Sequence, residues 1–410
     1  MAKIVSVQAR TVRVPLKQAT AFARRSVTAR DYSLVKIRTD DGVEGIGHCY
    51  AGHSGGAVVT LAVRDMLAPL LIGADAHSTE LIWKNLYQEV LLHGRAGSVM
   101  RALSILDIAL WDRNARAANL PLYKYLGAAY EGTVPAYGSG GYYLDGKTPE
   151  MLGEELASYV ALGLNAVKMK VGRGDPNSEE ARIAAAREAI GPDVLLMLDA
   201  NNAWSDVPTA LRYMDRFAPY DPYWIEEPFS PDQIDNHARL AAATSIPVAT
   251  GEIEAGRWRF KELLDKEAAA ILQTDAAVCG GITEFRRIAA LADCYGVNMC
   301  PHWFHDLHVH LVAAAPIGQF VEYFPDGKVF NSGRSSTGNW KSAMAAWPCR
   351  PAPGWVTSSM KRRLPSSTRI AGSKGPFKDD RFNEAVRIQR FLVRLDRYLL
   401  LSAPLGRRGG

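Results

Sequence analysis

Ionisable side chains stand at the ends of successive short apolar segments in the second half of the chain, and together they could carry out chemistry. In chain order they are Lys168, Lys170, Asp199, Glu226, Glu252, Asp275, His302 and Glu322. The carboxylates of Asp199, Glu226 and Glu252 are 27 and 26 residues apart, about one strand–helix unit each. If the segment ends converge, three oxygen ligands without sulfur suit Mg²⁺ or Mn²⁺ rather than zinc. For any one carboxylate alone, a salt bridge to a neighbouring helix is the simpler interpretation.

Two further features of this set are typical of general bases. Lys168 and Lys170 alternate by two, so both point to the same side of one strand. Adjacent ammonium groups near a divalent cation lower each other's pKa, which would make one of them a base near pH 7. The alternative is that both lysines only neutralise the carboxylates. His302 could pair with Asp275, which would fix its tautomer and raise its pKa.

The remaining histidines of the segment HWFHDLHVH do not form a second ligand cluster. Their spacing matches no metal-binding motif, so we expect them to be helix residues beyond the site. They are His305, His308 and His310.

The pattern around these residues predicts a parallel barrel. From Val134 onward, eight short apolar runs alternate with seven amphipathic helical segments. The carboxyl ends of barrel strands meet at one mouth, where the ionisable residues would converge. A doubly wound sheet is the alternative, but no GxGxxG turn follows the first strand. Before the barrel, strands at 3–14 and 31–50, with a turn at Asp41–Gly42, and helices at 57–72, 78–93 and 98–117 indicate an α+β unit.

Several of these segments resemble one family in order and spacing. They are DIALWDRNARAANLPLYKYLG, VKMKVG, DANN, WIEEP, TGE, QTDAAVCGG, PHW and VEYF. Over roughly residues 1–331 the chain resembles the mandelate racemase/muconate lactonizing enzyme subgroup of the enolase superfamily. The resemblance implies an N-terminal α+β capping domain over 1–130. It also implies an α/β barrel, a modified TIM barrel of (β/α)₇β form, over 131–331.

The resemblance also implies residue roles. Asp199, Glu226 and Glu252 would bind Mg²⁺. Lys170, tuned by Lys168, would be one base, and the His302–Asp275 pair would be the base on the other face. Glu322 would donate a hydrogen bond to the substrate carboxylate, Asn201 would contact substrate, and Ser139 is a weaker candidate. Arg24 and Arg25, in the capping-domain loop 19–28, could bind the distal carboxylate of a diacid, although both could equally face solvent.

The implied reaction is removal of the proton α to a carboxylate through an enediolate. The resemblance favours dehydration of an acid sugar, an aldonate or aldarate, to a 2-keto-3-deoxy acid. A racemase or epimerase of a 2-hydroxy acid would use the same two bases and is the alternative. A third hypothesis is a catalytically damaged member of the family with an altered C-terminus.

Composition is that of an ordinary globular protein: 410 residues, 48% hydrophobic and 22% charged. No run of 18 apolar residues occurs, and the N-terminal segment lacks an apolar signal core, so we expect a cytoplasmic protein without a membrane contact. Five scattered cysteines form no CxxC pair, which argues against a disulfide scaffold or zinc knuckle. We expect a small-molecule carboxylate substrate, no nucleic-acid partner and, from the resemblance, a homo-oligomer.

The segment 332–410 differs from the rest of the chain. It contains 16 Lys/Arg and 4 Asp/Glu, whereas residues 1–331 contain 32 and 39. Its helix and strand patterning stops after Asn331, where the family normally returns to the capping domain. We interpret it as an aberrant basic tail produced by a reading-frame shift, because a one-base shift restores NFRALIDRQLEIRDG, which resembles the family's C-terminal segment. A genuine basic extension that is disordered or binds acidic partners is the alternative.

This interpretation predicts that the coding sequence contains a one-base-shifted reading from codon 332 that encodes such a segment. Restoring that frame should raise solubility and activity together, because the lost segment would bury apolar side chains worth about 1.5–3 kcal/mol each. Sequencing the gene and comparing both proteins checks this. A gene without the shifted reading would identify the tail as a real extension.

Overall fold

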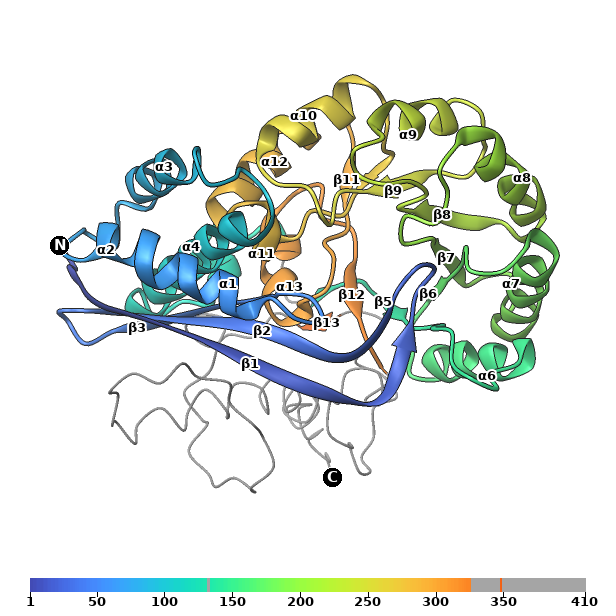
Figure 1. Cartoon of the computed structure of the whole chain (residues 1–410), viewed down its shortest axis with the longest axis horizontal. Helices are drawn as coiled ribbons and strands as arrows, with labels where there is room; N and C mark the ends of the chain where they lie inside the picture. The colour runs from blue at the N-terminus through green and yellow to red at the C-terminus, as the bar shows by residue number, and fades with distance from the viewer. Residues whose placement is uncertain (131–132, 326–346, 349–410) are drawn as a thin grey trace, which may run out of the picture.

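The computed structural model describes residues 1–130, 133–325 and 347–348 (Figure 1). An N-terminal strand-and-helix part, called the cap below, lies beside a ring of strands surrounded by helices, called the barrel. Of the predicted tail, only Trp347–Pro348 (β13) is described, and it pairs antiparallel with β4 (Thr133–Val134). The frame-shift prediction otherwise lies outside the described residues.

The cap begins with a three-stranded antiparallel sheet in the order β1 (Ile4–Ala21), β2 (Ser26–Thr39) and β3 (Glu44–Tyr50). The β1–β2 arm is longer than predicted, so the expected loop 19–28 is in fact the end of a hairpin. The prediction missed this because the register shifts between Pro15 and Thr20, which interrupts the alternation of side chains. The arm reaches the barrel, where Ala21 bridges to Tyr143.

Helices cover one face of this sheet. The predicted helix 57–72 is present as one continuous helical run, but a π-helical turn stands in its middle, and Pro69 lies in the first turn after it. The longest cap helix, α4, packs on β3 because Gly45 and Gly47 lack a Cβ that would strike its backbone. The cap helices are α1 (Gly56–Leu61), η1 (Ala62–Leu67), α2 (Ala68–Leu71), α3 (Thr79–Val90), α4 (Gly97–Ala117) and α5 (Leu122–Tyr125).

The barrel has the predicted (β/α)₇β form. Its eight strands are parallel neighbours in the order β11-β10-β9-β8-β7-β6-β5-β12. The strands are β5 (Ala136–Ser139), β6 (Ala166–Lys170), β7 (Leu195–Asp199), β8 (Pro222–Glu226), β9 (Val248–Thr250), β10 (Ile271–Leu272), β11 (Asn298–Met299) and β12 (Val321–Tyr323). Gln319 N donates to the Met299 carbonyl (2.9 Å), which joins the two edge strands and closes the ring.

Local sequence signals begin and end the connecting helices. Asp175 accepts hydrogen bonds from the first turn of α7, and the next residue, Pro176, needs no donor there. Asp206 caps α8 in the same way, and Gly296 ends α12 in the left-handed conformation. The helices are α6 (Pro149–Val160), α7 (Pro176–Ile190), α8 (Val207–Phe217) with η2 (Ala218–Tyr220), α9 (Ile234–Ala241), α10 (Arg257–Asp265), α11 (Ala276–Cys279), α12 (Gly281–Tyr295) and α13 (His305–Ala314).

Buried hydrogen bonds hold the cap on the barrel. Asp107 of α4 accepts from both the backbone N–H (2.8 Å) and the hydroxyl (2.6 Å) of Thr283 in α12. The same hydroxyl accepts from Trp111 Nε1 (2.8 Å). Burial raises the pKa of Asp107 to about 7, although both bonds from Thr283 oppose the rise.

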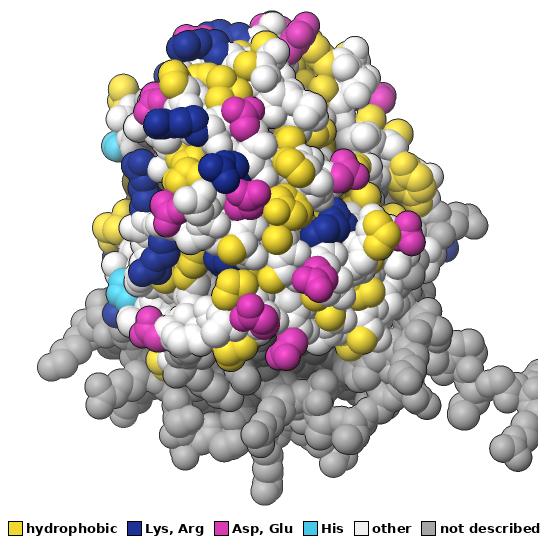
Figure 2. Space-filling view, turned by 90° about the vertical axis from the view of Figure 1, so that its right-hand side faces the viewer, with side chains coloured by type: hydrophobic (Ala, Val, Ile, Leu, Met, Phe, Trp, Pro, Cys, Tyr) yellow, Lys and Arg dark blue, Asp and Glu magenta, His cyan; other side chains and the backbone are white. Residues whose placement is uncertain are grey.

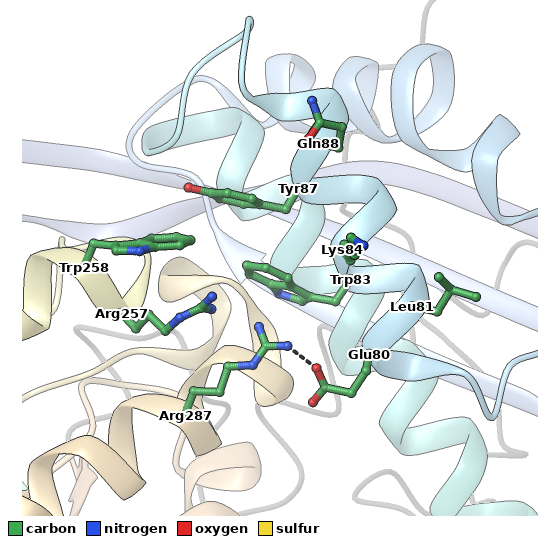
Figure 3. Close-up of a pocket in the computed structure, with 9 residues that line it drawn as sticks. All are labelled: Glu80, Leu81, Trp83, Lys84, Tyr87, Gln88, Arg257, Trp258 and Arg287. Carbon is green, nitrogen blue, oxygen red and sulfur yellow. Dashed lines mark hydrogen bonds and ion pairs between the residues drawn. The ribbon is translucent and has the colours of Figure 1, made fainter.

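An aromatic cluster lies at the outer edge of this junction (Figure 3). Trp83 and Tyr87 of α3 stack with ring centroids 4.8 Å apart, and Trp258 of α10 stacks on Tyr87 at 5.1 Å. The guanidinium of Arg287 lies 4.5 Å from the Trp83 ring and pairs with Glu80. These residues line an open cavity of about 510 Å³, so elements of cap and barrel contribute to one surface.

The outer face of the barrel carries charges of both signs. Figure 2 shows Lys and Arg interspersed with Asp and Glu over this side, without a continuous field of one sign. Among the described helices, none is long and apolar enough to span a bilayer.

Thr283→Val should destabilise the protein by about 2–4 kcal/mol, because it leaves the buried Trp111 N–H and one Asp107 oxygen without partners. Urea unfolding checks this. Thr274→Val is the control, since the Thr274 hydroxyl is buried without a partner among the described residues and should be lost at little cost. Equal midpoints for the two variants would show that the Thr283 hydrogen bonds do not hold the junction.

Candidate active site at the barrel mouth

Strand register brings the predicted carboxylates to one rim. Lys170 pairs with Asp199 across β6 and β7, and Asp199 pairs with Glu226 across β7 and β8. Glu252 follows the next strand, β9. Asp199 and Glu226 are fully buried, whereas the Glu252 side chain is 12% exposed. In the described part of the chain, no three His, Cys, Asp or Glu side chains already converge tightly enough to enclose an ion.

The ammonium of Lys168 occupies the centre of this rim. Its Nζ lies 2.7 and 2.8 Å from the two carboxylate oxygens of Glu226, and 2.8 Å from Glu322 Oε1. Lys170 forms an ion pair with Asp199. Because charges this deeply buried are costly unless paired, these contacts account for the presence of two lysines inside a barrel.

With only the protein's own groups around them, the two lysines have raised pKa values, and the lowering expected beside a divalent cation stays a prediction. Burial lowers the pKa of Lys170 and the charge of Lys168 lowers it further, but Asp199, Tyr142 and Glu226 together outweigh both, and the net shift is upward. The pKa of Lys168 is also raised, because Glu226 and Glu322 outweigh burial. Both lysines are therefore charged at neutral pH when only the protein's own groups surround them.

Glu322 also departs from expectation. Burial would raise its pKa, but Lys168 and His302 lower it to about 2, so the group is ionised. Its Oε2 accepts a hydrogen bond from Trp303 N (2.7 Å). An ionised carboxylate cannot donate the hydrogen bond that the resemblance implied, so that role requires Glu322 to gain a proton when substrate binds.

His302 is in contact with two carboxylates. Its Nδ1 lies 3.1 Å from Asp275 Oδ2 and its Nε2 lies 3.5 Å from Glu252 Oε2. Burial lowers the pKa of His302, but Glu252 and Asp275 raise it more, to about 9. Asp275 is held in turn by the N–H of Ala277 (2.7 Å) at the start of α11. The pairing expected for His302 and Asp275 is thus present in the geometry.

The donor set at the rim fits a hard divalent cation. Burial and the charge of Asp199 raise the pKa of Glu226, and burial and Glu252 raise that of Glu227. Crowded carboxylates of this kind are stabilised by a cation. The oxygens of Asp199, Glu226 and Glu252 would hold it, and no sulfur ligand is offered.

The predicted substrate contacts differ in their environments. Ser139 Oγ and Asn201 Oδ1 are buried and have no hydrogen-bond partner among the residues that the structure describes, so both retain capacity to bind a ligand. Arg24 donates to the Ala203 carbonyl (2.6 Å) and thereby ties the tip of the β1–β2 arm to the barrel. Arg25 is exposed. Neither arginine is placed in contact with the carboxylate rim.

Sequence reasoning missed four neighbours of the site. The Lys170 ammonium lies 5.6 Å from the ring of Phe22, at the tip of the β1–β2 arm, and 5.3 Å from that of Tyr142. His308, which was expected to lie beyond the site, is within 3.6 Å of Asp275. The second glutamate of WIEEP was a sequence signal for the buried Glu227. The positions of the Phe22 and Tyr142 rings beside the Lys170 ammonium depend on loop conformations, which no sequence pattern predicts.

Comparison with known proteins decides the family. The description "Mandelate racemase / muconate lactonizing enzyme, N-terminal domain" matches residues 4–127, and "Enolase C-terminal domain-like" matches residues 151–357. The chain belongs to the mandelate racemase/muconate lactonizing enzyme group of the enolase superfamily. The second match extends beyond Asn331 to residue 357. The proposed frame shift after Asn331 remains a prediction.

Similar proteins in this family have named activities. The L-talarate/galactarate dehydratase of Salmonella typhimurium is 34% identical over 76% of this chain and 77% of its own length. The 3,6-anhydro-alpha-L-galactonate cycloisomerase of Streptomyces coelicolor is 36% identical over 71% of this chain and 80% of its own. The L-talarate dehydratase of Polaromonas sp. JS666, solved with Mg and L-glucarate, superposes with a TM-score of 0.78 at 31% identity, covering 91% of this chain and 96% of that one.

Proposed function

We propose that this protein is a Mg²⁺-dependent hydro-lyase that dehydrates an acid sugar, an aldonate or aldarate, to a 2-keto-3-deoxy acid. The observation that supports the proposal is that Lys170 and His302, the two candidate bases, each contact a different one of the three carboxylates Asp199, Glu226 and Glu252. Lys170 contacts Asp199, and His302 contacts Glu252. Dehydratases among the relatives act on substrates of this class.

Each base must reach the right protonation state. Lys170 can accept the α-proton only after losing a proton of its own, and its ion pair with Asp199 opposes that loss. When bound, Mg²⁺ supplies positive charge that neutralises the carboxylates and the substrate carboxylate, which lowers the cost of an enediolate. His302, protonated with a pKa of about 9, is suited to donate a proton from the other side.

Dehydration follows from these positions. One base removes the proton from Cα, and the electron pair of the C–H bond enters the enediolate. The C–O bond at Cβ then breaks, and the protonated group opposite gives its proton to the leaving hydroxyl, which departs as water. The enol that remains tautomerises to the 2-keto acid. Reprotonation at Cα on the opposite face would instead give a racemase or epimerase, and the same two bases would serve that reaction.

The metal assignment predicts a loss of function on removing any ligand. Asp199→Asn, Glu226→Gln and Glu252→Gln should each abolish 2-keto acid formation, because each removes one ligand charge. Mg²⁺ should raise the thermal midpoint of the wild-type protein by mass action and should do so less in these variants. Asp235→Asn, which removes an exposed carboxylate on α9, is the charge-matched control.

EDTA treatment should stop turnover, and added Mg²⁺ should restore it. Full activity in EDTA would contradict the metal-assisted mechanism. A wild-type protein with neither activity nor a Mg²⁺-dependent midpoint would instead favour a damaged member of the family.

The two-base assignment predicts exchange specific to one face of the substrate. In deuterated water, Lys170→Met should stop exchange of the α-proton on the face that Lys170 serves, and His302→Asn should stop it on the other. Proton NMR of epimeric aldarates measures each face. Retention of exchange on both faces by both variants would reject these residues as bases.

A further inference from the structure

One buried imidazole joins the two loops that carry the His302–Asp275 pair. His308, in the first turns of α13, is fully buried. Its Nε2 lies 3.1 Å from the backbone nitrogen of Ala276, the residue after Asp275. Its Nδ1 lies 3.0 Å from the carbonyl of Trp303, the residue after His302. The imidazole thus bridges the backbone of Ala276 and that of Trp303, the residues that directly follow Asp275 and His302.

The partners of His308 determine its tautomer. A backbone N–H can only donate, so Nε2 accepts from Ala276 and carries no proton. A carbonyl can only accept, so Nδ1 carries the proton and donates to Trp303. A neutral ring satisfies both groups, whereas a protonated ring would lose the Ala276 bond. Burial lowers the pKa of His308, which agrees with a neutral ring.

The loop after His302 needs such a restraint. Trp303 and Phe304 have φ angles of 59° and 23°, a region that bulky residues adopt only at a cost in free energy. The Trp303 N–H is held by Glu322 Oε2 (2.7 Å) and its carbonyl by His308. The N–H and the carbonyl of Trp303 are therefore both hydrogen-bonded, the first to Glu322 of β12 and the second to His308 of α13.

We propose that His308 is a positioning residue that sets the distance and orientation between Asp275 and His302. The proposal rests on the function proposed above, because it concerns one of the two bases. The Nε2 atom of His308 also lies 3.6 Å from Asp275 Oδ1, which is the carboxylate oxygen that does not contact His302. It does not touch the carboxylates proposed to bind metal. Its loss should therefore impair proton transfer by His302 and spare Lys170.

The test compares three variants. His308→Phe keeps a planar ring but leaves the Ala276 N–H and the Trp303 carbonyl without partners. His308→Gln offers one acceptor and one donor on a single amide and should restore both contacts. His310→Phe is the control, because His310 lies two residues along the same helix, is also buried and stacks on Tyr123 instead.

Exchange at the α-carbon in deuterated water, with Mg²⁺ present, is the first measurement. In His308→Phe the His302 face should slow about 10- to 100-fold, as for a catalytic group displaced by about 1 Å, while the Lys170 face keeps its rate. His308→Gln should recover most of the loss, and His310→Phe should show none. Equal slowing on both faces, or an unchanged His302 face, would overturn the proposal.

A second measurement does not depend on activity. In protein labelled with ¹⁵N-histidine, the His302 Nδ1–H that donates to Asp275 should give a strongly deshielded proton signal. That signal should shift or broaden in His308→Phe and persist in His308→Gln and His310→Phe. An unchanged signal in folded His308→Phe would reject the positioning role. A wild-type protein that shows the signal but exchanges neither face would refute the proposed function and leave the positioning role intact.

Discussion

The ion pairs of Lys168 organise the mouth of this barrel. One ammonium lies within 2.8 Å of carboxylates from β8 and β12, two strands that are nearly a hundred residues apart in the chain. A buried carboxylate without a partner would be costly, so the lysine permits Glu226 and Glu322 to face each other in the interior. The same contacts keep Glu322 ionised and Lys168 charged. Any cation or substrate that enters must redistribute this charge before either of the proposed bases can act.

Much of the fold and of the site could be predicted because it depends on strand period and topology. Side chains two apart on a strand share a face, and parallel barrel strands end at one rim, so Lys170, Asp199 and Glu226 had to converge there. Protonation states could not be predicted in this way. They depend on distances of about 3 Å, and at those distances Asp199 outweighs the mutual repulsion of the lysines. The ionised state of Glu322 has the same origin.

Other differences arise where tertiary contacts override local pattern. The β1–β2 arm extends past Pro15 because strand pairing resumes after a register shift. The tip of the arm also contacts the barrel, and no local sequence pattern predicts this contact. His308 was expected, from its place in HWFHDLHVH, to be a helix residue beyond the site. The helix assignment is confirmed, but the tight turn at Trp303 and Phe304 rotates the start of α13 so that this side chain lies behind Asp275.

The cap contributes to both halves of the site. Phe22 of the β1–β2 arm lies beside the Lys170 ammonium, while Tyr50 at the end of β3 stacks on Trp303, the neighbour of His302, at 4.9 Å. These contacts come from two separate places on one sheet, because Tyr50 pairs with Tyr32 in the middle of β2 and Phe22 lies at the arm tip, and that sheet packs on α4. A shift of the cap would therefore disturb the surroundings of both proposed bases together, whereas the proposed role of His308 concerns only His302. Cap placement and base alignment are thus separate constraints, although both depend on buried hydrogen bonds to α11, α12 and α13.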